Sequence, residues 1–387
     1  MKQLPGLVTL ALWSLALGCA NGPGAAPGDD DPGGKADGVS GAASRCRNFE
    51  ARAQALSAPI DGLTPSGDLP LPTLGPDDSG VFHPPAGYTE GGTFAQAIDQ
   101  PQWWIDPSTL VASEPAGSLR VVEWNVERGN HLDGVIRVMK RLNADVWLLN
   151  ETDLYGHNSG NVVVGREIAR ALGYSYYTGI EFYEYRTDRQ GTSGNSIVSR
   201  YPILDGYKLD VPMMLSQGGY DWSTNSSEPR CGRRNALGVH IDVPSGSVDG
   251  GWATVHFVSF HAENKATSGA RQLQFQFVTD NLVGYDEPTV LGGDFNTVSV
   301  GEGPNLRQYL SQKWSQNGAA GALRDCSWGD DSITFSAAVF LHLRIDWMLV
   351  QPGSAGSIDC PTKDGYSVQG NDGTSDHKPV VTRMAVP

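Results

Sequence analysis

The 387-residue chain has few basic side chains, with 28 lysines and arginines against 43 aspartates and glutamates. The formal charge of −15 excludes a basic nucleic-acid coat protein, whose affinity comes from neutralising many phosphates. The 48 glycines and 24 prolines follow no Gly-X-Y period, which excludes collagen. No Cys-x-x-Cys pair occurs among the five cysteines, which argues against a zinc ribbon, and we find no internal repeat.

The N-terminus carries a short positive start, Met1-Lys2, and an apolar run from Leu4 to Leu17. This run is too short to span a bilayer, which takes about 20 apolar residues, and is typical of a secretory signal peptide. It ends in Ala-Leu-Gly before Cys19, which resembles a bacterial lipoprotein box with Ala and Leu in reversed order. We favour lipidation of Cys19 over an ordinary signal with an incidental cysteine. Residues 1–19 are therefore expected to direct export, with Cys19 anchoring the protein in the cell envelope unless it is secreted.

Residues 20–118 divide into two further segments. Residues 20–43 are mostly Gly, Ala, Pro and Asp, cannot bury a core and are expected to form a flexible linker. Residues 44–118 are expected to form an arm that packs on the main domain, with a short helix over 44–57. Trp103 and Trp104 are either a membrane or ligand contact or, more commonly, buried aromatics of such an arm.

Export also bears on the cysteines. With Cys19 set aside, Cys46, Cys231, Cys326 and Cys360 remain, and outside the cytoplasm four cysteines suggest two disulfides in one of three pairings. We prefer the pair Cys326–Cys360 because both residues flank one predicted strand.

From residue 119 onward, strand and helix patterns alternate, which predicts one large α/β domain over 119–387. Apolar residues at helical spacing predict helices over 132–142, 165–172 and 269–283. The expected strands are 120–126, 145–150, 195–200, 236–243, 253–260, 288–291, 344–350 and 379–384.

Polar residues follow or precede these apolar runs, and neighbouring strand ends meet at one edge of a sheet, where ligands commonly bind. The residues concerned are Asn125, Glu127, Glu151, His261, Glu263, Asp294, Asn296, Asp376 and His377. Taken singly, each also has an ordinary structural interpretation, such as a helix cap, a turn or a satisfied histidine.

Together these residues predict hydrolytic chemistry at a divalent cation. Glu151, Asp294 and Asp376 offer the hard oxygen ligands that Mg²⁺, Mn²⁺ or Ca²⁺ require, and histidines can move protons near neutral pH. Asp346 lies inside an apolar strand, where a carboxylate needs a partner, and an imidazole is the natural one. His256 points to the opposite strand face from His261 and is expected to be structural.

The ordered blocks resemble the endonuclease/exonuclease/phosphatase superfamily of metal-dependent phosphoesterases over about residues 119–385. The blocks are Glu123-Trp-Asn-Val126, Leu149-Asn-Glu-Thr152, Gly194-Asn-Ser-Ile-Val-Ser-Arg200, Phe260-His261, Gly293-Asp-Phe-Asn-Thr297, Arg344-Ile-Asp-Trp347 and Ser375-Asp-His-Lys-Pro379. The resemblance implies an α/β four-layer sandwich, in which helices flank two packed mixed β-sheets and the site lies at one edge.

The resemblance also implies roles for individual residues. The implied metal ligands, for Mg²⁺ with Mn²⁺ or Ca²⁺ as alternatives, are Asn125, Glu151 and Asp376. The implied catalytic residues are His261, Asp294, Asn296, Asp346 and His377, and the implied substrate-binding residues are Asn195 and Arg234. His377, held by Asp346, would be the general base or a phosphate contact, and His261 would contact the phosphate or protonate the leaving oxygen. The apurinic-endonuclease branch lacks a histidine at position 261, which disfavours base-excision repair.

Some positions depart from the family pattern. Asn150 stands where Gln is commoner, and Glu127 stands where some members have Asp, so a direct metal role for Glu127 is doubtful. The long stretch from Met213 to Arg234 is expected to face the substrate. Whether Arg233 and Arg234 bind substrate or pair with acids stays open.

The favoured function is that of an exported monomeric phosphodiesterase in which metal-activated water hydrolyses P–O bonds. Among such enzymes, we favour a nuclease that acts on DNA or RNA. The alternative is a sphingomyelinase or phospholipase C-like enzyme, or an inositol-phosphate phosphatase. A hydrophobic docking hairpin would favour a phospholipid substrate, and the sequence offers no clear one beyond Trp103-Trp104. A non-catalytic surface binding protein is a third, lesser alternative.

Overall fold

The computed structural model describes residues 102–104 and 118–386, the latter without 155, 157, 161, 187–188, 202, 226, 229, 246–251, 283–287, 300, 318–322, 328, 339–340, 353–357 and 361–362. The expected signal peptide, linker, helix over 44–57 and Cys46 lie outside the described residues, as does the side chain of Cys231. No helix within the described ranges is long and apolar enough to cross a membrane.

Two mixed sheets form the centre of the molecule. The first sheet has eight strands in the order β1-β4-β5-β3-β2-β16-β15, with β7 also paired to β4. These strands are β1 (Gln102–Trp104), β2 (Ser118–Asn125), β3 (Val146–Leu154), β4 (Ser175–Arg186), β5 (Arg189–Ser199), β7 (Arg230–Gly232), β15 (Tyr366–Val368) and β16 (Val380–Ala385). The sheet includes a piece of the expected arm, because β1 pairs antiparallel with β4.

The second sheet has six strands in the order β11-β14-β10-β9-β8-β6. They are β6 (Ile203–Asp210), β8 (Asn235–Pro244), β9 (Trp252–Phe260), β10 (Thr289–Asp294), β11 (Arg324–Asp325) and β14 (Asp346–Gln351). A separate pair is formed by β12 (Phe335–Ala338) and β13 (Leu341–Leu343). Short 3-10 helices occur at η2 (Glu127–Gly129), η3 (Leu215–Gln217), η4 (Trp222–Thr224) and η6 (Lys363–Gly365).

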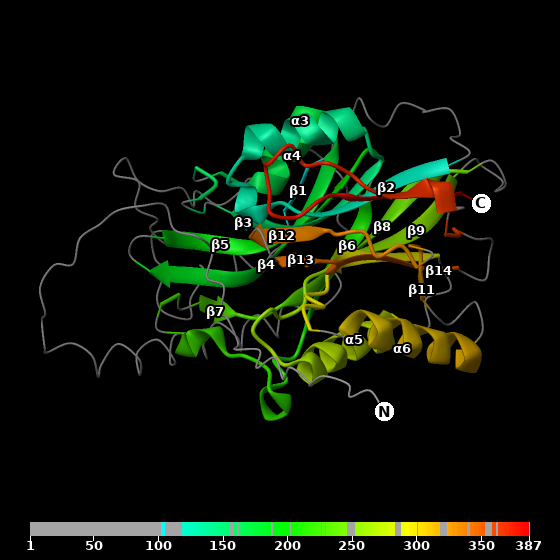
Figure 1. Ribbon diagram of the computed structural model, residues 1–387. Helices are drawn as coiled ribbons and strands as arrows, with labels where there is room; N and C mark the ends of the chain where they lie inside the picture. Colours follow the sequence, from blue (N-terminus) through cyan, green and yellow to red (C-terminus); the bar gives the residue numbers. More distant parts are fainter. Residues whose placement is uncertain are drawn as a thin grey trace, which may run out of the picture.

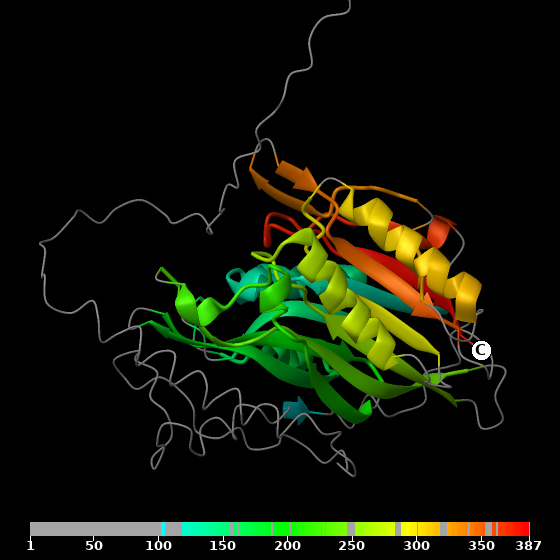
Figure 2. The ribbon, with the colours of Figure 1, turned by 90° about the horizontal axis from the view of Figure 1, so that it is seen from below.

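Helices cover the outer faces of both sheets. Helices α3 (Leu132–Leu142) and α4 (Val164–Leu172) lie on the first sheet, and α5 (Ser268–Leu282) and α6 (Glu302–Asn317) lie on the second (Figure 1). The view from below shows α5 and α6 side by side across the second sheet (Figure 2). The order helix, sheet, sheet, helix confirms the predicted four-layer α/β sandwich.

Three buried apolar clusters hold these layers together. The cluster between the sheets joins Leu148 and Ile197 of the first sheet to Phe257 and Val290 of the second. A second cluster packs α3 and α4 on the outer face of the first sheet, around Trp147. A third packs α5 and α6 on the second sheet. Burial of this apolar surface is the main force that fixes the strand ends relative to each other.

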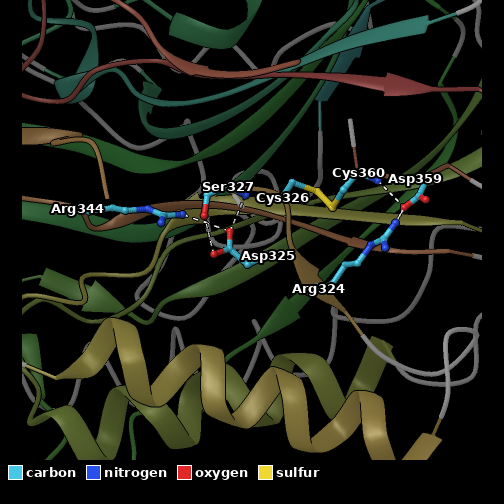
Figure 3. Close-up of a disulfide and its surroundings, with 7 residues drawn as sticks. All are labelled: Arg324, Asp325, Cys326, Ser327, Arg344, Asp359 and Cys360. Atoms are coloured by element: carbon cyan, nitrogen blue, oxygen red, sulfur yellow. Dashed lines mark hydrogen bonds and ion pairs between the residues drawn. A yellow bond between two sulfur atoms is a disulfide. The ribbon is translucent and has the colours of Figure 1, made fainter. Parts of the chain in front are cut away.

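A disulfide closes the far edge of the second sheet. Cys326, next to β11, is bonded to Cys360 with an S–S distance of 2.10 Å, which confirms the preferred pairing. Figure 3 shows an ion pair on each side of this bond, Arg344 with Asp325 and Arg324 with Asp359. The bridge therefore ties residue 360 to β11 in a region that is already rich in charge pairs.

The expected helices agree closely with α3, α4 and α5, but several elements were not expected, among them β4, β6 and α6. Helix α6 consists mostly of polar residues, so its apolar pattern is weak. In α6, Gly303-Pro304 suggests a break, yet Pro is tolerated in the first turn of a helix, where its missing N–H has no partner to lose.

Candidate active site

The sheet register brings the polar strand ends together at one edge. Asp294, the last residue of β10, lies directly opposite Asp346, the first residue of β14. His261 follows the neighbouring strand β9, and β2 of the other sheet ends at Asn125. His377 comes just before β16, which pairs with β2. The site therefore spans the rims of both sheets.

The conformation at the end of β10 and in the turn after it depends on Gly293 and Asn296. Gly293 has a φ of 156°, and a Cβ there would lie 1.7 Å from the carbonyl oxygen of Phe260, so only glycine fits. Asn296 adopts a left-handed φ of 49°, which Asn tolerates better than most residues. Its backbone N–H donates to Asp294 Oδ1 at 2.9 Å, and its side-chain amide donates to the Ala262 carbonyl at 3.0 Å. Asp294 is thereby held in one orientation.

An irregularity in β3 places Glu151. The pairing of β3 with β5 shifts register between Leu149 and Thr152, and Glu151 has a left-handed φ of 52°. A bulge of this kind re-aims a side chain out of the regular alternation. Asn150 stays fully buried and its side-chain oxygen accepts the Asp294 N–H at 2.8 Å, whereas Glu151 remains partly exposed.

Asp294 is the central carboxylate. Its Oδ2 accepts a hydrogen bond from Asn125 Nδ2 at 3.2 Å. The same oxygen lies 3.6 Å from His261 Nε2 and 3.6 Å from His377 Nε2. The Nε2 atoms of both imidazoles therefore lie close to one carboxylate oxygen.

His377 is paired with Asp346, as the isolated carboxylate in its apolar strand suggested. His377 Nδ1 lies 2.9 Å from both Asp346 oxygens, and the Phe335 ring lies 4.8 Å from the imidazole. Burial lowers the pKa of His377, but Asp346 and Asp294 outweigh burial and raise that pKa to about 10. The imidazole therefore carries a proton on each nitrogen at neutral pH.

His261 has a different environment. Its Nδ1 lies 2.7 Å from the Nη1 of Arg234 and 3.4 Å from Glu181 Oε2, and the side chain is 1% exposed. Arg234 also donates to Glu181 Oε2 at 3.0 Å. Glu181 was not singled out in the sequence, although it shares the signal that identified Asp346. It is a carboxylate between apolar neighbours, Ile180 and Phe182, in a strand.

The two residues implied to bind substrate lie inside the protein. Asn195 is fully buried below the strand ends, where it donates to Glu181 and to Asn235 Oδ1 at 3.0 Å and accepts from Asn150 at 2.9 Å. Arg234 is 4% exposed and is bonded to acids of the protein. In this structure both residues support the walls of the site.

Several side chains could hold a cation. Ligand atoms of Asp294, Asp346 and His377 all lie within 4.8 Å of one another. The Asp346–His377 hydrogen bond already occupies two of these groups, so the partly exposed Glu151 and Asp376 are the more available carboxylates. No side chain in the described ranges donates a hydrogen bond to Glu151.

The electrostatics separate the two acids. Burial would raise the pKa of Glu151, but the surrounding cationic groups, including Arg128 and Arg234, lower it to about 2, so it is ionised. Burial, together with the charges of Glu151 and other carboxylates, outweighs the opposing effect of His377 and raises the pKa of Asp376 to about 7. Negative charge therefore crowds around Asp376, a situation that a bound cation relieves.

Residues 122–377, well over half of the chain, match the Endonuclease/Exonuclease/phosphatase family, and the chain belongs to this family. The chain therefore has the fold of a phosphoesterase of this family. No curated protein sequence matches the chain.

One solved structure shows the same fold, and two others have a lower similarity. An endonuclease/exonuclease/phosphatase from Beutenbergia cavernae is 20% identical, with a TM-score of 0.50 over 70% of this chain and 72% of that one. TDP2 of D. rerio, in complex with single strand DNA product, is 16% identical with a TM-score of 0.44 over 70% and 99% of the two chains. Mannosyl-6-phosphatase Bt3783 of Bacteroides thetaiotaomicron is 14% identical with a TM-score of 0.41 over 69% and 98%. At these identities the likeness concerns the fold alone.

Proposed function

We propose that this protein is a divalent-metal-dependent phosphodiesterase and that its favoured substrate is nucleic acid. The observation that carries the proposal is the position of Asp294 Oδ2, 3.6 Å from the Nε2 atoms of two buried histidines and beside a cluster of carboxylates. Such a site offers a carboxylate to orient water, two N–H groups for phosphoryl oxygens and negative charge to hold a cation.

The residues present fit Mg²⁺. Glu151, ionised and without a hydrogen-bond donor in the described part of the chain, and Asp376, crowded by like charge, would hold the ion together with the Asn125 amide. Few carboxylates, with water and substrate phosphate as the remaining ligands, are the usual Mg²⁺ arrangement. The bound ion would supply Lewis-acid polarisation of the phosphoryl oxygen. Mn²⁺ would serve at the same oxygen ligands.

The proton roles follow from the hydrogen bonds. Asp294, fixed by Asn296 and Asn125, orients a water molecule and accepts one of its protons. The water oxygen bonds to phosphorus, and the P–O bond to the leaving oxygen breaks. His377 Nε2 provides a proton for the leaving oxygen, since Asp346 keeps the imidazole charged.

Nicking of supercoiled plasmid tests the proposal. Wild-type protein is compared with Asp294→Ala in Mg²⁺, in Mn²⁺ and in EDTA, with Arg307→Met on the outer helix α6 as a matched control. We expect metal-dependent nicking by wild type and by the control. We expect no nicking by Asp294→Ala. A folded wild-type protein that leaves DNA and RNA intact would contradict the nuclease proposal.

A second candidate, a phospholipid phosphodiester, is favoured by the β12–β13 pair. The pair lies beside the site, because Phe335 bridges to His377 and Ser336 N–H donates to the Asp376 carbonyl at 3.0 Å. The sequence from 337 to 341 is Ala-Ala-Val-Phe-Leu, an apolar stretch. Release of phosphocholine from sphingomyelin without DNA nicking would select this candidate, and an inositol-phosphate panel is the next comparison.

Export and lipidation belong to the proposal as well. The apolar run before Cys19 supports export, and so does the Cys326–Cys360 disulfide, since disulfides persist in oxidising compartments. Full-length protein should sediment with membranes, and Cys19→Ala should be released. Equal release of wild type and variant would argue for a secreted protein without an anchor.

A further inference from the structure

The two catalytic histidines differ in what their Nδ1 atoms meet. His377 Nδ1 faces a carboxylate, whereas His261 Nδ1 lies 2.7 Å from the Nη1 of Arg234. The Glu181 carboxylate is farther from His261 Nδ1, at 3.4 Å, and is itself bonded to Arg234 at 3.0 Å. The nearest partner of His261 is therefore a cation.

A guanidinium can only donate hydrogen bonds, because it has no acceptor and stays charged in proteins. A gap of 2.7 Å between two nitrogens has room for one hydrogen, and Arg234 provides it. His261 Nδ1 must then present its lone pair. The proton of the neutral ring lies on Nε2, the nitrogen 3.6 Å from Asp294 Oδ2 at the centre of the site.

Arg234 is held in this position from several sides. Its Nη1 is bonded to Glu181, and its Nε lies 3.5 Å from Glu263 Oε2. Glu263 Oε2 also accepts a hydrogen bond from Trp222 Nε1 at 2.8 Å. Arg234, Glu181, Glu263 and Trp222 are all nearly fully buried, so the guanidinium has little freedom to turn away from His261.

We infer that Arg234 is a positioning residue that keeps His261 as the neutral Nε2–H tautomer, so that His261 donates a hydrogen bond to a phosphoryl oxygen and does not protonate the leaving oxygen. A neutral imidazole gives up its N–H proton far less readily than an imidazolium, but it remains a good hydrogen-bond donor. The role of His261 in turnover rests on the proposed function. The tautomer does not, because it follows from the apo geometry.

The tautomer can be observed directly in the full chain by ¹⁵N NMR of histidine-labelled protein near neutral pH. The signal of His261 is assigned by its loss in His261→Gln. We expect an unprotonated Nδ1 and a protonated Nε2. A protonated Nδ1, in either a neutral or a charged ring, would overturn the inference.

Substitution of Arg234 adds a second readout. In Arg234→Met, His261 Nδ1 loses its donor and can turn to Glu181 as a donor itself, so the spectrum should move toward the Nδ1–H form. Arg234→Lys keeps a donor and should keep the Nε2–H form even if Arg234→Met fails to fold. Arg307→Met, on α6 and paired with Asp325 and Asp331, should leave the spectrum unchanged. An unchanged tautomer in folded Arg234→Met would show that Arg234 does not set it.

Leaving-group dependence separates the two roles of His261 in catalysis. A poor alkoxide leaving group needs a proton, whereas 4-nitrophenolate does not. If His261 contacts the phosphoryl oxygen, His261→Gln should lose about 100- to 1,000-fold in kcat on both kinds of diester, the usual cost of removing one such donor. A loss that vanishes with the 4-nitrophenyl ester would make His261 the proton donor. If no diester is turned over, the proposed function fails while the NMR result stands by itself.

Discussion

Replacing Glu123 with glutamine should stabilise the protein relative to wild type by an amount that grows as the pH rises. Glu123 lies in β2 with its side chain fully buried, and neither carboxylate oxygen has a hydrogen-bond partner in the described part of the chain. Burial raises the pKa of Glu123 well above its usual range, and the nearby Asp346 and Asp294 raise it further. The folded protein therefore keeps this carboxyl neutral, and a neutral amide of the same shape should replace it with little disturbance.

The sign and size follow from proton linkage. Unfolded Glu123 loses its proton near its ordinary pKa of about 4.3, whereas the folded side chain keeps it until the raised pKa is reached. Between these two values the unfolded state binds fewer protons, so the free energy of unfolding falls with pH by up to about 1.4 kcal/mol per unit. From pH 5 to pH 7 the difference in favour of Glu123→Gln should widen by up to about 2.7 kcal/mol.

The assay is denaturant unfolding of both proteins at several pH values between about 5 and 8, in EDTA so that no cation changes the local charge. Glu167→Gln is the control, since the Glu167 carboxylate is partly exposed and paired with Arg166 at 3.1 Å. A difference between wild type and Glu123→Gln that stays constant with pH would mean that Glu123 is ionised in the fold. That result would refute the reasoning about a neutral carboxyl behind the site.

Three other predictions concern the site and the disulfide. Asp346→Asn should lower kcat about 10³- to 10⁴-fold. Because Asp346 raises the pKa of His377, the variant should also shift the alkaline limb of the pH–rate profile to lower pH. An unshifted limb would contradict the pairing of these two residues. Mg²⁺ should raise the melting temperature of wild type but not of Glu151→Gln, with a gain of about 2.7 kcal/mol at 100 times Kd; an equal rise in both proteins would exclude Glu151 as a ligand. Replacing both Cys326 and Cys360 with serine, which opens a loop with a sequence separation of 34, should cost about 3 to 4 kcal/mol of unfolding free energy; a loss below about 1 kcal/mol by denaturant titration would be inconsistent with this.

The parts of the fold that sequence could predict are those with a strong local signal. Helix α3, with apolar residues at regular helical spacing, was expected with the same bounds that the structure has. The pairing of Asp346 with an imidazole was expected because a carboxylate in an apolar strand needs a partner. His261, Asp294 and His377 could be identified as candidates because each is a polar residue next to an apolar run that predicts a strand.

The remainder depends on contacts between distant segments. Glu181 belongs to β4, an unexpected strand, and its contact with His261 arises only when the two sheets pack together. Arg234 was expected in a loop that faces the substrate. The packing instead buries it as a partner of His261. Glu123 belongs to a motif in the sequence, but only the three-dimensional surroundings show that its carboxyl has no hydrogen-bond partner in the described part of the chain.

The most direct test of the central claim is hydrolysis of bis(4-nitrophenyl) phosphate by the full chain, with Mg²⁺ or Mn²⁺ titrated against EDTA, in wild type and in Asp294→Asn. The account predicts release of 4-nitrophenolate that requires metal, returns when metal is added back and is lost in the variant. Hydrolysis that persists in EDTA, or that survives in Asp294→Asn, would contradict a metal-dependent phosphodiesterase centred on this carboxylate.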